Sequence, residues 1–233
     1  MLLAVREIDT YYGTSHVLQG VSLEVAQGEV VALLGRNGMG KTTTLRSIMG
    51  LTPPAAGSIR FQGREVRGQP PYVLSRLGLA YRPDDLRIFP ELTCRENLEI
   101  AARLSRRQGP WNLERVEELF PILRERRRQK GINMSGGEKK MLALGRALMA
   151  NPLLILMDEP SEGLAPLIVR ALARAIAAIR EHGTTILMAD QNLKFCRKVC
   201  DRGYIMEKGR IVHQGGMAEI WADEEVVSKY LAL

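Results

Sequence analysis

Residues 30–42 read VVALLGRNGMGKT, an apolar run that passes directly into a glycine-rich segment. The apolar part, residues 30–34, is typical of a central parallel strand that is buried on both faces. The part from Gly35 to Thr42 fits the pattern G-x-x-x-x-G-K-[ST]. Its glycines let backbone N–H groups turn inward around phosphates, and the helix N-terminus adds a positive dipole end. We therefore expect a strand, a phosphate-binding loop and then a helix from Thr42 to Met49, closed by Gly50.

This loop gives its polar residues expected roles. Lys41 is expected to reach the β- and γ-phosphates of a nucleotide, and the Thr42 hydroxyl to be a ligand of Mg²⁺. A glycine-rich turn without a ligand is the structural alternative, and the position of the segment between a strand and a helix argues against it. The other residues expected around the nucleotide are Gly35, Arg36, Asn37, Gly38, Met39, Gly40 and Thr43.

A second apolar run, Leu153 to Met157, ends in the acids Asp158 and Glu159. A carboxylate at the C-terminal end of a parallel strand lies beside the phosphate loop, so Asp158 is expected to hold Mg²⁺ through water. Glu159 is expected to point towards the γ-phosphate and polarise the attacking water. A strand that ends in Asp-Glu is mostly structural by itself, and its pairing with the phosphate loop favours the nucleotide interpretation.

A third segment, MSGGE at residues 134–138, precedes an expected helix. Ser135, Gly136 and Gly137 form a second anion-binding surface with the free N–H groups of that helix, and Glu138 comes next. One nucleotide does not need two such surfaces from one subunit. The sequence therefore predicts a head-to-tail dimer, in which each nucleotide lies between one phosphate loop and the Ser-Gly-Gly of the other chain. An ordinary capped helix start is the alternative.

The remaining patterns predict the architecture around these motifs. Residues 21–25 and 58–61 alternate as in an antiparallel sheet with one wet face. Thr93 and Glu96 form a capping box that opens a helix to about Leu104, and helical spacing continues from Trp111 to Phe120, just before Pro121. Strands and helices then alternate: strands at 153–157 and 184–189, helices at 166–182 and 192–200, and a hairpin at 204–212.

Together these elements predict one α/β domain over residues 1–233. A mostly parallel nucleotide-binding core is expected at 1–84 and 151–233, with an N-terminal antiparallel β part. A helical insertion, which includes the helix after Ser135, is expected at 85–150.

The composition is that of an ordinary globular protein. The 233 residues are 45% hydrophobic and 25% charged, which argues against disorder. No run approaches the roughly 18 to 20 apolar residues that cross a bilayer. The start reaches Arg6 too soon for a signal peptide, so a cytoplasmic protein is expected. Cys94, Cys196 and Cys200 form no disulfide framework, and the last two are expected to be buried thiols in preference to half a metal site.

The net charge of +7 arises from 33 Lys and Arg against 26 Asp and Glu. All of the excess lies between Ala102 and Arg146, where twelve basic residues face five acidic ones. Much of it falls in the run from Arg124 to Lys130. Such a cluster is either a solvated helical face or a surface for an anionic partner.

These motifs, in this order and over nearly the whole chain, resemble those of the ATP-binding subunits of ABC transporters. Residues 35–42 resemble the Walker A loop, 134–138 the signature loop, 153–159 the Walker B strand and 161–164 the D-loop. The resemblance implies a P-loop NTPase fold of the ABC type, ATP hydrolysis with Mg²⁺, and Tyr12 stacked on adenine.

The same resemblance implies the partners. They are a second ABC ATPase subunit, identical or different, membrane permease subunits and, indirectly, a solute-binding protein. The chain is then expected at the cytoplasmic side of the cell membrane as a peripheral protein. Its basic helical part would face the permease and the anionic inner leaflet, and no nucleic acid partner is expected.

Finer features resemble one branch, the paired ATPases of branched-chain amino acid importers. They are RIFPELT at 87–93, SEGLAP at 161–166 and DRGY at 201–204. Most ABC ATPases carry His in the switch loop, whereas this branch usually has Gln, as at Gln191; its amide can donate to a γ-phosphate oxygen. Urea or amide importers use very similar ATPases. Lipopolysaccharide exporters tend to keep the His, and soluble ABC ATPases of DNA repair or translation generally carry insertions or a second cassette, so both are less favoured.

Several positions depart from the family pattern. Asp84 stands where the family has Gln and the branch often Glu; it is expected to take part in catalysis with Glu159 and Gln191 and to contact the metal. Arg82 replaces an apolar residue and is expected to pair with Asp84 or Asp85. Met134 stands for Leu, and Lys139-Lys140 replaces a frequent Gln pair. None of these changes affects Lys41, Asp158 or Glu159, so ATP hydrolysis is expected.

Overall fold

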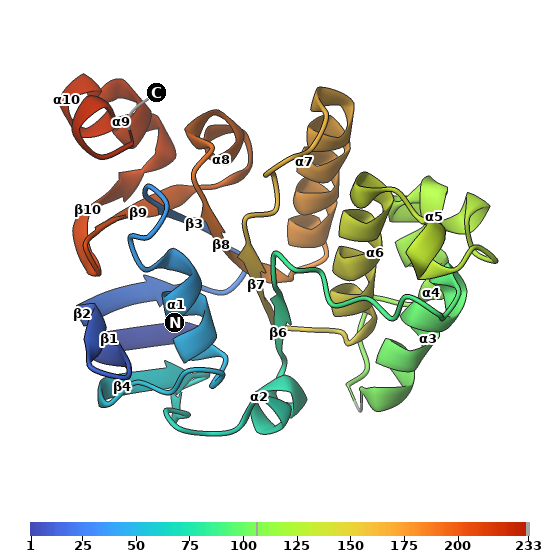
Figure 1. The fold of residues 1–233 in the computed structure, drawn as a ribbon, viewed down its shortest axis with the longest axis horizontal. Coiled ribbons are helices and arrows are strands. Elements are labelled where there is room, and N and C mark those ends of the chain that lie inside the picture. Colours follow the sequence, from blue (N-terminus) through green and yellow to red (C-terminus); the bar gives the residue numbers. More distant parts are fainter. Residues whose placement is uncertain (106, 232–233) are drawn as a thin grey trace.

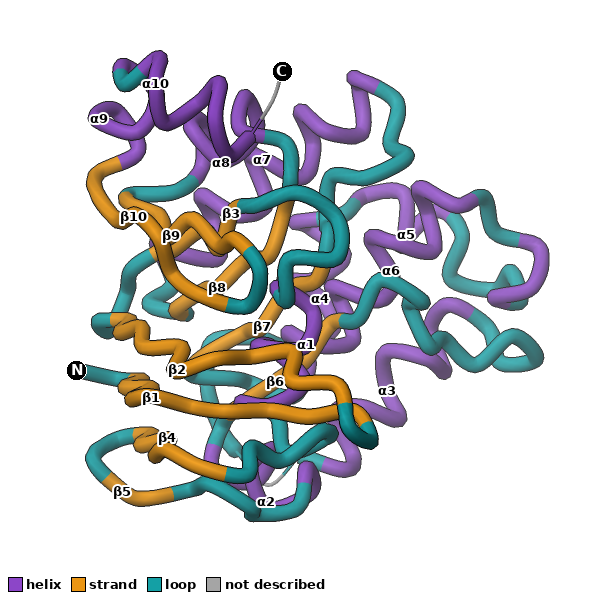
Figure 2. Tube along the Cα trace, turned by 60° about the vertical axis from the view of Figure 1, so that its left-hand side comes forward, coloured by secondary structure: helices purple, strands orange, loops and turns teal. Residues whose placement is uncertain are grey.

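The computed structural model describes residues 1–105 and 107–231 and contains two β-sheets (Figures 1 and 2). The larger sheet has six strands in the order β10-β9-β3-β8-β7-β6, and all neighbours are parallel except β9 and β10. Its strands are β3 (Val30–Leu34), β6 (Leu79–Arg82), β7 (Leu154–Asp158), β8 (Thr185–Asp190), β9 (Arg202–Glu207) and β10 (Arg210–Gly216). The predicted, mostly parallel core sheet is confirmed.

The smaller sheet is antiparallel and is built from the first part of the chain, as predicted. Its order is β2-β1-β4-β5. The strands are β1 (Leu3–Tyr12), β2 (Ser15–Val25), β4 (Ala56–Phe61) and β5 (Arg64–Glu65). Helix α1 (Lys41–Ile48) packs against strands of both sheets, and it thereby places the phosphate loop where the two sheets meet.

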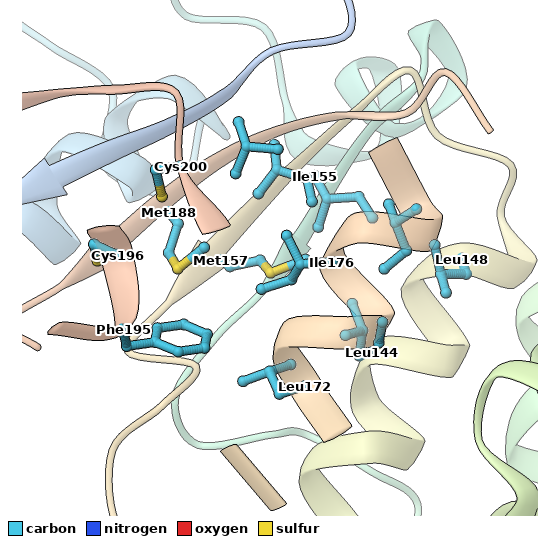
Figure 3. Packing of buried hydrophobic residues seen from close by; sticks show 14 of the residues in the cluster. Leu144, Leu148, Ile155, Met157, Leu172, Ile176, Met188, Phe195, Cys196 and Cys200 are labelled. Atoms are coloured by element: carbon cyan, nitrogen blue, oxygen red, sulfur yellow. The ribbon is translucent and has the colours of Figure 1, made fainter. Parts of the chain in front are cut away.

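The continuous apolar runs of the central strands are explained by burial on both faces. In β3, Val30, Ala32 and Leu34 belong to one hydrophobic cluster, whereas Val31 and Leu33 belong to another on the opposite face. The strands β7 and β8 divide their residues in the same way. Figure 3 shows the first cluster, in which strand residues such as Met157 and Met188 meet helical side chains such as Ile176.

The helices on that face are α7 (Pro166–Glu181) and α8 (Leu193–Val199). The C-terminal part adds α9 (Met217–Ala222), α10 (Glu224–Val226) and a π-helical turn (Val227–Leu231). The short helix α2 (Pro71–Leu77) leads into β6. All predicted strands and helices from residue 153 onward are present, with ends that differ by one to a few residues.

The remaining helices gather on one side of the molecule, beyond β6 (Figure 1). They are α3 (Cys94–Leu104), α4 (Leu113–Leu119), α5 (Pro121–Glu125), a 3₁₀ turn (Gly131–Asn133) and α6 (Gly136–Met149). Helix α3 begins at the predicted capping box, since Thr93 accepts a hydrogen bond from the Glu96 backbone and Glu96 accepts one from Thr93.

Helix α4 lies within the predicted helical stretch from Trp111 to Phe120 and is shorter than it at both ends. Asn112 caps α4, so Trp111 lies outside the helix, and its indole Nε1–H donates to Thr184 Oγ1 at 3.1 Å. Helix α4 ends before Pro121, as the sequence indicates, and Pro121 occupies the first turn of a further helix, α5, which was not predicted. A proline is well suited to that position because the first N–H groups of a helix have no intrahelical partner.

The β9–β10 turn connects the two sheets to the phosphate loop. The Gly209 N–H donates to the Met39 carbonyl at 3.1 Å, and the Gly209 carbonyl accepts from the Gln19 N–H at 2.9 Å. A Cβ atom at Gly209 would lie 2.1 Å from the Val17 carbonyl oxygen, so only glycine fits there. Because of these contacts Gly209 is buried, whereas Lys208 beside it is exposed.

All three cysteines are buried, and burial raises the pKa of the Cys94 thiol to about 12. Cys196 and Cys200 pack beside Met188 and Phe195 in the cluster of Figure 3. In the described residues no three His, Cys, Asp or Glu side chains gather as a metal site would require. No described helix combines the length and apolarity that a membrane span needs.

Candidate active site

The predicted phosphate loop joins β3 to α1. Gly40, at φ 105°, precedes the first residue of α1, and a Cβ atom at Gly35 would come within 2.6 Å of the Met206 carbonyl oxygen. Lys41 is only 4% exposed, and its Nζ donates to the carbonyls of Gly35 at 2.8 Å and Arg36 at 3.1 Å. The loop therefore curls around the lysine that is expected to bind phosphate.

The Asp158 carboxylate is held by two hydroxyl groups. Thr42 Oγ1 donates to its Oδ1 at 2.9 Å, and the Tyr81 hydroxyl donates to its Oδ2 at 3.0 Å. Burial raises the pKa of Asp158, and the two hydrogen bonds oppose that rise by favouring the ionised form. Thr42 and Asp158, both expected to hold Mg²⁺, are thus in direct contact. Tyr81 received no role from the sequence, because its contact with Asp158 depends on β6 lying beside β7.

Glu159 comes directly after β7 in an unusual backbone conformation. Its φ is 43°, in the left-handed region that residues other than glycine adopt mainly where the surroundings impose it. Its N–H donates to the Ala189 carbonyl at 2.8 Å, and its Oε1 lies 3.6 Å from Lys41 Nζ. Burial, together with a hydrogen bond to Glu162 that favours the protonated form, raises the pKa of Glu159 to about 7, against the opposing charge of Lys41. A carboxylate of that pKa is suited to act as a general base near neutral pH.

These residues open onto a pocket of about 380 Å³. Thr42, Asp84, Asp158 and Glu159 line it, so four members of the predicted catalytic and metal set are brought together. Hydroxyl and carboxylate oxygens are the donors that Mg²⁺ prefers, and the set therefore fits a nucleotide-bound magnesium ion. The other lining residues are Asn37, Gly38, Arg46, Leu51, Tyr81, Pro83, Asp85 and Arg87.

The expected pairing of Arg82 with Asp84 or Asp85 is wrong. Arg82 is 3% exposed, and its Nη1 donates to the main-chain carbonyl of Asp158 at 2.7 Å. Asp85 pairs with Arg87 at 2.9 Å, and Asp84 Oδ1 lies 3.9 Å from Lys140 Nζ. The reason is the position of Arg82 in β6, where its side chain points into the molecule beside β7.

The signature segment begins α6 with a second capping box. The Ser135 Oγ accepts from the Glu138 N–H at 3.3 Å, and Glu138 Oε2 accepts from the Ser135 N–H at 2.7 Å. Ser135 and Gly136 are exposed, and Gly137 is half-buried. In the described part of the chain, none of residues 135–138 lines the pocket beside the phosphate loop.

Several predicted residues do not line that pocket. Gln191 is exposed directly after β8, on the edge of the sheet that also carries Glu159. Tyr12 ends β1, is 45% exposed, and has its hydroxyl 3.4 Å from Thr52 Oγ1. Arg36 is exposed at the loop, Met39 is held by the Gly209 N–H, and Thr43 is buried in α1.

Asp190 is a residue of the site that the sequence reasoning missed. It ends β8 at 1% exposure and accepts hydrogen bonds from the N–H groups of Ser161 at 3.2 Å and Asn192 at 2.8 Å. The Asp190 carboxylate therefore joins the start of the D-loop, at Ser161, to the loop that carries Gln191. An acid at the end of an apolar strand was the available signal.

The sequence profile of the ABC transporter family matches residues 18–162, which include the phosphate loop, the signature segment and the Walker B strand. The chain belongs to the ABC transporter family. It is the ATP-binding subunit and an ATPase of such a transporter. A high-affinity branched-chain amino acid transport ATP-binding protein, BraG of Pseudomonas aeruginosa, is 41% identical over 99% of both chains. A lipopolysaccharide export system ATP-binding protein, LptB of Escherichia coli, is 36% identical over 98% of this chain and 96% of the relative.

Solved structures of ABC transporter subunits agree with this assignment. An ATP-binding subunit of an ABC transporter matches with a TM-score of 0.85 and 30% identity, over 99% of this chain and 96% of the other. An ATP-binding cassette of an ABC transporter in its ADP conformation matches with a TM-score of 0.81 and 29% identity, over 97% of both chains. The predicted fold class is confirmed.

Proposed function

We infer that this chain hydrolyses ATP to drive the import of branched-chain amino acids through a membrane permease. The whole-chain identity of 41% to BraG carries the inference about the solute. Asp158 and Glu159 line one pocket, and Lys41 Nζ lies 3.6 Å from Glu159 Oε1, which supports hydrolysis.

Two such subunits, identical or related, are proposed to close head to tail on two ATP molecules. In that arrangement Lys41 of one subunit and Ser135 of the partner subunit bind the phosphates of the same nucleotide. This explains why the signature segment does not line the pocket of its own chain. Gly35, Gly38 and Gly40 supply backbone N–H groups to the same phosphates, and Tyr12 stacks on the adenine.

Within each site, Thr42, Asp158 and Asp84 are the residues proposed to hold Mg²⁺. The ion supplies charge neutralisation at the β- and γ-phosphates. Glu159 accepts a proton from the attacking water, for which its raised pKa is suited. Gln191 donates from its amide to a γ-phosphate oxygen. The reaction needs no covalent intermediate, because positioning and charge stabilisation suffice for phosphoryl transfer.

Residues 85–150 are proposed to form a helical subdomain that moves against the core and pushes on the permease. This part carries a basic surface made of the exposed residues Arg124, Arg126, Arg127, Arg128 and Lys130. Arg126 pairs with Glu138, and Lys130 with Glu91. In the described part of the chain, the other three arginines have no acidic partner within ion-pair distance.

The unpaired arginines leave a positive field for an anionic surface. We place this face towards the permease and the inner leaflet, at the cytoplasmic side of the cell membrane. Each base near an anionic leaflet contributes about 1 kcal/mol to the attraction. A solute-binding protein would act on the far side of the permease, without contact to this chain.

Lipopolysaccharide export is a second candidate, because LptB proteins are 34 to 36% identical over nearly the whole chain. The lower identity and Gln191 in the switch loop favour the importer.

Co-purification from detergent-solubilised membranes tests the proposal. The importer predicts that an affinity-tagged chain recovers a permease, and that proteoliposomes containing the complex take up leucine only with ATP. Recovery of a lipopolysaccharide-extracting permease, or a complex that hydrolyses ATP without moving leucine, isoleucine or valine, would contradict it.

A further inference from the structure

The turn that carries Glu159 is held at both ends by cations. At its first residue, the Asp158 carbonyl accepts a hydrogen bond of 2.7 Å from Arg82 Nη1. At its last residue, the Glu162 carbonyl accepts a hydrogen bond from Lys140 Nζ. Glu159 lies between these two anchors in its left-handed conformation. A non-glycine residue holds such a conformation only where its surroundings over-determine it.

The two cations come from different parts of the molecule. Arg82 is the last residue of β6 in the core sheet, and Lys140 lies one turn into α6, the helix that begins at the signature segment. Both line one small pocket with the apolar residues Met157, Pro160 and Leu164. The Lys140 side chain is 16% exposed, so most of it is packed and its position depends on that of α6.

Two cations in one poorly solvated pocket repel each other. Such a pair is stable only where each cation donates to a hydrogen-bond acceptor or pairs with an acid. Here each cation binds a carbonyl at one end of the same turn. Lys140 also lies 3.9 Å from Asp84, at the rim of the nucleotide pocket.

We propose that Arg82 and Lys140 are positioning residues that clamp the Asp158–Glu162 turn, so that movement of α6 displaces Glu159. When α6 keeps its place relative to the sheet, both carbonyls are held and Glu159 points into the pocket. When α6 shifts, Lys140 carries the Glu162 end of the turn with it. The inference deepens the hydrolysis step of the proposed function and is independent of the solute.

Lys140→Met in the full-length chain tests the clamp, because Met keeps the bulk of the stem and removes the donor. We expect kcat for ATP hydrolysis to fall by roughly tenfold or more, since sub-ångström errors in positioning are costly in catalysis. The KM for ATP should stay within about twofold, because Lys140 does not line the nucleotide pocket. Amide hydrogen exchange of residues 160–165 should become faster, and Lys140→Arg should restore part of kcat.

Lys139→Met is the matched control. Lys139 lies on the same helix and donates to the Ile132 carbonyl at 3.2 Å, away from the turn. The Lys139→Met variant should keep the wild-type kcat and the wild-type rate of amide hydrogen exchange at residues 160–165. The double variant Arg82→Met/Lys140→Met should lose less than the product of the single losses, because one free end already releases the turn.

Four results would overturn the clamp. They are Lys140→Met with wild-type kcat, Lys140→Met with unchanged exchange at 160–165, equal losses in the Lys139 control, and multiplicative losses in the double variant. Since exchange and basal hydrolysis need no permease, these results are separate from any failure of the import assignment.

Discussion

The Tyr81 hydroxyl donates to Asp158 Oδ2 at 3.0 Å. With the bond from Thr42 to the other oxygen, it fixes the plane of the carboxylate that is proposed to hold Mg²⁺. Such support from neighbouring groups tunes both the orientation and the basicity of a metal ligand.

Tyr81→Phe should therefore lower the apparent affinity for Mg²⁺ in ATP hydrolysis, so that a higher Mg²⁺ concentration is needed for the same rate. Loss of one hydrogen bond to a charged group costs about 1.5 to 3 kcal/mol, which corresponds to at least roughly tenfold in the apparent Mg²⁺ affinity. The measurement is the ATPase rate against Mg²⁺ concentration. Tyr72→Phe, at an exposed tyrosine of α2, serves as the control and should leave the curve in place.

Glu159→Gln should separate binding from hydrolysis. The amide cannot accept the proton of the attacking water, so hydrolysis should fall by roughly 100-fold or more while ATP binding persists. Single-turnover hydrolysis and equilibrium binding of ATP give the two quantities. Near-normal turnover would remove Glu159 from its proposed role. Glu181→Gln, at the exposed end of α7, is the control.

The raised pKa of Glu159 predicts how rate and stability depend on pH. Only the ionised form is a base, so kcat should rise as the pH passes through about 7. Its folded-state pKa lies above the ordinary value of 4.5, so between these values the folded chain keeps a proton that the unfolded chain has lost. Stability from this group therefore falls as the pH rises through that window.

Thermal unfolding checks the sign. The gain in Tm of Glu159→Gln over the parent should be larger near about pH 8 than near about pH 5, because the variant carries no charge to bury. A gain that is equal at both values, or larger in acid, would show that Glu159 has an ordinary pKa in the folded chain.

The two capping boxes allow structural and functional roles of Ser135 to be separated. Ser135→Ala and Thr93→Ala each remove an N-cap side chain, and each should lower the free energy of unfolding by about 1 kcal/mol. Only Ser135→Ala should also lower ATP hydrolysis, because Ser135 is proposed to contact the nucleotide of the partner subunit. Urea unfolding and ATPase assays give the comparison. Equal ATPase losses in both variants would reduce Ser135 to a helix cap.

Charge reversal tests the basic surface. Arg127→Glu/Arg128→Glu should weaken binding to vesicles rich in phosphatidylglycerol by at least roughly tenfold, since each base contributes about 1 kcal/mol. Hydrolysis in solution should be unchanged. Arg126 is left intact because it pairs with Glu138 of the signature segment. Arg170→Glu/Arg174→Glu on α7 is the matched control, and equal loss in both pairs would point to total charge alone.

The features predicted well from the sequence are those that depend on residues close together in the chain. The phosphate loop, the two acids at the end of β7 and the capping box at Thr93 depend on contacts within a few positions, and the structure contains each of them. The capping box at Ser135 corresponds to the alternative of an ordinary capped helix start. The alternation of β3 between two clusters is likewise explained by an unbroken apolar run.

The features that were missed join residues far apart in the chain. Arg82 was expected to meet the nearest acids, yet it binds the carbonyl of a residue 76 positions away because β6 and β7 are neighbours in the sheet. Tyr81, Lys140 and Asp190 gain their contacts in the same manner. Helix α5 was missed because Pro121, which follows the end of one helical pattern, also suits the start of another helix.

The turn at Lys208 and Gly209 has a consequence for anyone who alters this protein. Surface hairpins are ordinarily good places to insert residues, tags or fluorophores. This one holds the Met39 carbonyl, directly before the glycine that opens α1, and has no room even for a methyl group at Gly209. Lengthening the turn would shift the phosphate loop. A label inserted there is therefore expected to impair the ATP hydrolysis that it is meant to report.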